Sequence, residues 1–196
     1  GVTSTATAGT LSGGADIETD DALRARLLTR IQQPPHGGAG YDYTAWALQV
    51  AGVTRAWVVP NELGLGTVTV RFVRDNDGSG SAIIPDAGEV AAVQAWIDAL
   101  RPVTAALTVV APTAVPLNFT ITGLSPSTSA VQAAIIASLQ DLITREATPG
   151  GTLLISRMRE AISIAAGEAD HVLTTPSANV VNTTGNLTTL GTVTFV

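Results

Sequence analysis

The chain has 196 residues, of which 45% are hydrophobic, and it contains no cysteine. A chain of this length can bury the core of one large or two small domains. The lack of cysteine excludes disulfide scaffolds, thiolate zinc sites and cysteine nucleophiles. No stretch approaches the ~18 consecutive apolar residues of a membrane-spanning helix, so we expect no membrane partner.

The chain has few charged residues, and its basic residues are all of one type. Charged residues make up 13% of the chain, about half of the ~25% typical of soluble domains. The net charge is −6, and all ten basic residues are arginines. An acidic surface without lysine matches nucleic acid poorly, so we expect no nucleic-acid partner. Two explanations stay open: burial of the surface against partner proteins, where arginine is favoured over lysine, or a genomic bias in codon composition.

Residues 1–18 show no helical periodicity, and we expect them to be a linker or the end of a missing N-terminal domain. The chain begins with Gly1, and its single methionine, Met158, lies deep in the sequence. We therefore expect the chain to be a fragment of a longer protein.

The next segment is predicted to form two helices. Thr19 is a suitable N-cap, and Leu23, Leu27 and Ile31 recur at the spacing of one helical face. Two prolines and two glycines then end this helix and open a loop. A short second helix is predicted over residues 41–50.

Alternating polar and apolar residues predict strands over residues 53–59 and 67–74. Asp86 and Glu89 have the spacing of a capping pair at the start of a third helix, and a strand is predicted over 107–111. The apolar face of that helix comprises Val90, Val93, Ile97 and Leu100.

The second half is predicted to continue with a strand over 115–122 and a long helix that starts at Ser125-Pro126. A further helix ends at Gly167, and strands are predicted over 171–175 and 192–196. The stripe of the long helix comprises Val131, Ile135, Leu139 and Leu142.

The two halves show the same order of elements. Helix, Pro-Gly-Gly-type break, helix, strand and strand describe residues 20–74 and again 128–196. The hexapeptides Leu65–Val70 and Leu190–Phe195 share five of six residues. Threonine–valine alternation is also common in any half-exposed strand, but a duplicated module is the better explanation.

The predicted fold class is therefore α+β, with two similar small helix-and-sheet lobes. We expect a first module over residues 19–112 and a second over 113–196. Duplication also predicts that Val68 and Val70 occupy places equivalent to those of Val193 and Phe195.

One acidic loop has the most specific metal-binding spacing in the sequence, that of a calcium site. Asp75–Gly80 with Asp86 at the twelfth position resembles an EF-hand loop. A strand rather than a helix precedes it, however, and Asp86 replaces the bidentate glutamate while also serving as a helix cap. We expect an ordinary exposed connection and no bound metal.

The two histidines, His36 and His171, lie far apart and give no zinc-ligand spacing. No Gly-x-Ser-x-Gly motif supplies a nucleophile, and without lysine no P-loop exists. We expect surface histidines, no catalytic residues, no cofactor and no enzyme.

Aromatic residues give the candidates for protein contact. Trp57 and Trp96 lie on apolar stripes and are predicted to be core residues. Tyr41 and Tyr43 adjoin a Gly-rich loop, where an interface anchor is as plausible as local packing. With His36 they are our interface candidates, within the Pro34–Tyr43 loop. The Ser177–Thr189 connection is a second candidate surface.

Several longer motifs resemble the baseplate J-like family, the Mu-like baseplate wedge proteins of contractile-tailed phages. The resemblance covers nearly the whole chain. Its motifs are Gly13–Leu28, Gln33–Gly38, Ala51–Val58, Ile97–Val103, Pro149–Leu154, Arg159–Ile162, Ala166–Glu168 and Leu190–Thr192.

The resemblance implies a structural part of a tail baseplate wedge, which joins neighbouring wedge proteins around the hub and couples baseplate rearrangement to sheath contraction. It implies other wedge and hub proteins as partners, self-association of the full-length protein, and location in the virion baseplate after assembly in the host cytoplasm. The alternative is a cation-assisted ligand- or glycan-binding module that uses the Asp75–Asp86 loop.

Overall fold

The computed structural model describes residues 19–75 and 83–196. The chain divides into two compact units, residues 1–36 and residues 37–196. The described part of the first unit contains helix α1, Asp20–Gln32, as predicted. Two aspartates in its first turn and Arg30 in its last turn complement the helix dipole.

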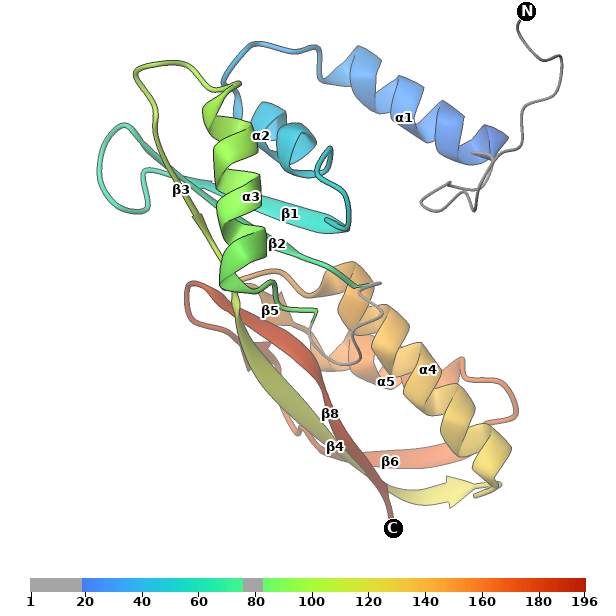
Figure 1. The fold of residues 1–196 in the computed structure, drawn as a ribbon. Coiled ribbons are helices and arrows are strands. Elements are labelled where there is room, and N and C mark those ends of the chain that lie inside the picture. Colours follow the sequence, from blue (N-terminus) through green and yellow to red (C-terminus); the bar gives the residue numbers. More distant parts are fainter. Residues whose placement is uncertain (1–18, 76–82) are drawn as a thin grey trace, which may run out of the picture. The chain divides into compact units, whose positions relative to one another are not determined.

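The second unit contains a three-stranded sheet in the order β1-β2-β3 (Figure 1). Strand β1, Arg55–Pro60, runs antiparallel to β2, Thr67–Val73, and β2 runs parallel to β3, Ala106–Val110. Because parallel neighbours need a crossover connection, helix α3, Ala87–Asp98, lies between β2 and β3 in the chain. These elements and α2, Gly40–Ala47, form the first lobe.

The core of the first lobe lies between its sheet and its two helices. Val70 and Phe72 point to the same face of β2, where they pack with residues of α2 and α3. Asp86 caps α3 by accepting from Glu89 N, and the Glu89 carboxylate accepts from Asp86 N, which confirms the predicted capping pair. The buried residues of this core are Tyr43, Ala47, Val70, Phe72, Val93, Ile97 and Val109.

The second lobe contains a sheet in the order β6-β4-β8. The central strand β4, Thr113–Ser125, runs antiparallel to β6, Asp170–Thr175, and parallel to β8, Asn186–Phe195. Helices α4, Ser129–Glu146, and α5, Ile155–Ser163, pack against this sheet (Figure 1). The short strands β5, Thr152–Leu153, and β7, Val180–Val181, pair with each other.

The predicted stripe of α4 is confirmed, since all four of its residues are buried in the core of the second lobe. The predicted start of this helix is wrong. Strand β4 continues through Ser125, and α4 begins only after Thr128, whose hydroxyl accepts a hydrogen bond from Val131 N. A threonine N-cap satisfies one of the free amide groups of the first helical turn.

Two further predictions are wrong. Trp96 is 45% exposed, and Leu100 is also exposed. The predicted turn-rich segment 177–189 contains β7 and the first residues of β8, so the last strand is longer than predicted.

The α+β class is confirmed, but the duplicated module is not. Val68 and Val70 contact the core of the first lobe, and Val193 and Phe195 contact that of the second. The first pair, however, lies on a central strand paired with two neighbours, whereas the second pair lies on the edge strand β8. Among the described residues no helix is long and apolar enough to cross a membrane.

Candidate protein-contact surfaces and the junction between the lobes

A largely buried arginine, Arg55, joins the two lobes of the second unit. Arg55 Nε and Nη2 donate to the Asp75 carboxylate at 2.8 and 2.7 Å. Its Nη1 donates to the carbonyl oxygens of Thr144, at 2.9 Å, and Ala147, at 3.4 Å, at the end of α4. The last carbonyls of a helix have no intrahelical donor, and a cation there also complements the helix dipole.

The Asp75 carboxylate is held in its ionised form. Although burial by itself would raise the pKa of Asp75, hydrogen bonds from Arg55 and Thr54 and the charge of Arg55 together lower it below its usual value. The Thr54 hydroxyl donates to Asp75 Oδ2 at 2.6 Å, and Asp75 N donates to the same hydroxyl at 2.9 Å. Both side chains of the Arg55–Asp75 ion pair are less than one fifth exposed.

Apolar contacts extend this junction across the first sheet. Strand alternation sends Phe72 into the core of the first lobe and its neighbour Val73 into that of the second. Trp57 packs against the second core as well, and the Arg55 guanidinium lies 5.2 Å from the centre of its ring. Residues of both lobes therefore cover the two faces of the first sheet.

A second arginine contacts the opposite lobe. Arg71, paired with Trp57 in the β1–β2 register, donates through both terminal nitrogens to the Glu62 carboxylate at 2.8 Å each. Its guanidinium lies against Gly185, where an added Cβ would come within 3.3 Å of Nη2. Hydrogen bonding and the charge of Arg71 lower the pKa of Glu62.

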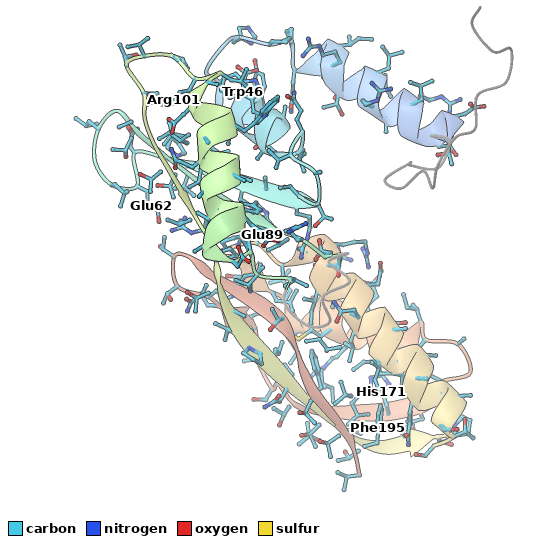
Figure 2. The ribbon with its side chains drawn as sticks, in the orientation of Figure 1. Trp46, Glu62, Glu89, Arg101, His171 and Phe195 are labelled. Carbon is cyan, nitrogen blue, oxygen red and sulfur yellow. The ribbon has the colours of Figure 1, made fainter. Side chains whose placement is uncertain are left out.

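The predicted interface anchor Tyr43 belongs to the core instead. Its side chain is 1% exposed, and its ring meets that of Trp46 edge to face at a centroid distance of 5.0 Å. Figure 2 labels Trp46. Burial raises the pKa of Tyr43. The i, i+4 spacing of Tyr43 and Ala47, both buried on α2, is the sequence signal that separates this ring from Tyr41.

The other two interface candidates, His36 and Tyr41, belong to different compact units. His36 is exposed and ends the first compact unit, whereas Tyr41 is half-buried at the start of α2 in the second. The adjoining loop is fixed by Asp42, whose buried carboxylate accepts from the backbone of Gly38 and Ala39 at 2.9 Å each.

An apolar surface that sequence analysis did not identify lies at one end of the first sheet. Leu65 is 95% and Val103 is 98% exposed, and they flank the 3.0 Å hydrogen bond from Ala106 N to the Gly66 carbonyl. We name this surface the apolar tip; it comprises Leu65 and Val103. Its sequence signal was the pair of leucines in a glycine-rich turn, where no core position is available.

Two acidic residues of the EF-hand-like loop bind groups of the protein itself. Asp75 is bound by Arg55, and Asp86 caps α3, while residues 76–82 of the EF-hand-like loop lie outside the described residues. The described residues contain no group of three or more metal-ligating side chains. The expectation of a surface histidine is wrong for His171, whose side chain is 9% exposed and bonded through Nδ1 to Glu168 Oε1 at 2.8 Å.

Comparison with known proteins places these features in a family context. Residues 35–111 match the Baseplate J-like central domain, and residues 115–196 match the Baseplate J-like protein C-terminal domain. Baseplate protein gp47 of Escherichia phage Mu is 38% identical over 93% of the chain and 52% of its own length. Mu-like prophage FluMu protein gp47 of Haemophilus influenzae is also 38% identical, over 97% of the chain and 55% of its own length.

The chain thus spans about half the length of these curated relatives. Among solved structures, the chain is similar to a chain of the cryo-EM structure of the anti-feeding prophage baseplate, with a TM-score of 0.56. That match covers 89% of this chain and 42% of the other at 14% identity, and it supports the fold.

Proposed function

Because this chain belongs to the baseplate J-like family, we propose that it is part of a wedge protein of a contractile tail baseplate. In this role it joins neighbouring wedge proteins around the hub and couples rearrangement of the baseplate to contraction of the sheath. The family indicates a baseplate structural role rather than an enzymatic one.

The junction between the lobes is the observation that carries this proposal. A part that transmits displacement between its neighbours must resist deformation within itself. Arg55 ties β1 to the end of α4, and Arg71 lies against Gly185, so polar and apolar contacts both cross the junction. Such a connection favours movement of the two lobes as one body.

The apolar tip is the proposed contact with a neighbouring baseplate protein. Two nearly fully exposed aliphatic side chains at one end of a sheet are unfavourable in water, and apolar surface of this kind is typical of protein contact sites. Other wedge and hub proteins are the proposed partners, together with self-association of the full-length protein. The proposed location is the virion tail baseplate, after assembly in the host cytoplasm.

The alternative of a cation-assisted glycan-binding module is not supported by a specific observation. The first and last acidic residues of its loop, Asp75 and Asp86, both bind groups of the protein itself. A calcium ion at this loop would have to compete with Arg55 for the Asp75 carboxylate.

Native mass measurement tests the proposal. The full-length protein is mixed with the other baseplate proteins of its particle, and a stable complex is expected. The double substitution Leu65→Ser and Val103→Ser should weaken that complex at least tenfold while the protein stays folded by circular dichroism. Val181→Ser, an exposed aliphatic residue on β7, is the matched control. Failure of the unaltered protein to bind any baseplate protein would contradict the proposal.

A further inference from the structure

Strand β6 lies at an edge of the second sheet. Among the described residues, β4 is the only strand that pairs with it. An edge strand presents unpaired backbone N–H and C=O groups, and an extended segment of another chain can pair with them.

A surface hollow of about 330 Å³ lies beside this edge. It is lined by residues 171–173 of β6 and by Arg159 and Ser163 of α5. Successive side chains of a strand point to opposite faces: Leu173 is buried in the core, whereas Val172 is largely exposed. A hollow touched by three consecutive strand residues therefore opens along the strand's edge.

The hollow contains a cation without a carboxylate partner. The other arginines of residues 37–196 each form an ion pair with an aspartate or glutamate, but Arg159 forms none with a described residue. Arg159 is exposed, so its guanidinium is available to a ligand. In a chain with a net charge of −6, an arginine left without a carboxylate is suited to an acidic ligand.

One polar side chain in the hollow has a fixed position. His171 is nine-tenths buried, and Glu168 holds its Nδ1, which leaves Nε2 for a ligand (Figure 2). The Glu168 carboxylate is 6% exposed and already bonded to His171. The charged group that a ligand meets in the hollow is therefore the positive Arg159.

We propose that the groove between β6 and α5 binds an extended segment of a partner protein, which adds a strand to β6 and places an acidic side chain against Arg159. Backbone hydrogen bonds to β6 provide the affinity, and the Arg159 guanidinium selects for a carboxylate. The volume of the hollow falls within the ~300–1,000 Å³ range of ligand sites. This groove would be one of the contacts of the proposed assembly role, and the identification of the partner as a baseplate protein rests on that proposed function.

A peptide titration followed by amide NMR tests the groove directly. The probe is an eight-residue peptide of alternating valine and threonine with one central glutamate. Shifts are expected at residues 159–163 and 171–173. Replacing the peptide glutamate by glutamine, or a central valine by proline, should each weaken binding at least fivefold, since the first removes the carboxylate and the second a backbone donor.

Variants of the chain complete the test. Arg159→Gln should weaken binding at least fivefold, whereas Arg145→Gln, which alters an exposed arginine on α4, should leave it unchanged. Absence of shifts at 171–173, or equal binding by the Arg159 variant, would overturn the proposal. Equal shifts from sodium acetate would show a simple anion site, and shifts that grow with chain concentration alone would show a second copy; either would overturn it.

The two proposals can fail separately. If the peptide does not bind but the full-length protein still assembles with other baseplate proteins, the groove proposal is wrong and the assembly role stands. If the peptide binds but no assembly is detected, the proposed function is wrong.

Discussion

Replacing Arg55 with methionine should destabilise the protein by about 2–4 kcal/mol. The substitution keeps an apolar side chain beside Trp57 but removes the guanidinium. Among the described residues, Asp75 then keeps only Thr54 as a side-chain donor, and the Thr144 carbonyl loses its 2.9 Å hydrogen bond. Hydrogen bonds to charged groups contribute about 1.5–3 kcal/mol each.

Because Arg55 and Asp75 are both partly exposed, the loss of stability should be smaller than for a fully buried ion pair. Breaking a fully buried pair costs about 3–5 kcal/mol, and an exposed pair contributes about 0–1 kcal/mol. Arg55 is 19% and Asp75 18% exposed, which favours a value between these limits. Arg145→Met is the control, because its ion pair with Asp141 is largely exposed and its loss should cost less than about 1 kcal/mol.

Urea unfolding followed by circular dichroism measures both variants. The double variant Arg55→Met, Asp75→Asn should be less destabilised than the sum of the two single variants, since the residues interact directly. An Arg55→Met variant as stable as the Arg145→Met control would refute the assigned role of the junction.

Three other predictions concern pH, the core and a helix cap. The pKa of Asp75 is lowered in the folded state. Its contribution to stability is therefore present above its usual pKa and is lost as the pH falls through the folded value. Below about pH 4, the free energy of unfolding measured in urea should fall more steeply with decreasing pH for the parent protein than for Asp75→Asn. Tyr43→Ala should cost about 3–5 kcal/mol in the same assay, whereas Tyr41→Ala should cost less than half as much, and equal losses would contradict the core position of Tyr43. Thr128→Ala should cost about 1 kcal/mol, with Thr128→Ser as the conservative control; no loss would show that the cap of α4 does not contribute.

Local patterns were sufficient for most helices and strands. The spacing of Val131, Ile135, Leu139 and Leu142 identified α4 because only one face of that helix enters the core. The start of α4 differs from the prediction because Ser-Pro also suits a strand end, and Thr128 is the residue that caps the helix. Trp96 was mispredicted because it precedes Ile97 by about 100° of helical rotation, enough to leave it at the margin of the buried face.

The arrangement of strands and the lobe junction could not be obtained from such patterns. Insertion of β4 between β6 and β8 is a non-local pairing, so two halves with the same element order have different sheets. The Arg55–Thr144 hydrogen bond joins residues 89 positions apart. Neither Arg55 nor Arg159 has a local sequence signature, since each acts through groups that only the fold brings near.

The most direct test of the baseplate role is electron microscopy of particles from cells in which the gene of the full-length protein is deleted. Tails with complete baseplates are expected to be absent and to return when the gene is supplied in trans. A gene with Leu65→Ser and Val103→Ser is expected to restore fewer complete baseplates than one with Val181→Ser. Normal tails with complete baseplates in the deletion strain would contradict the account.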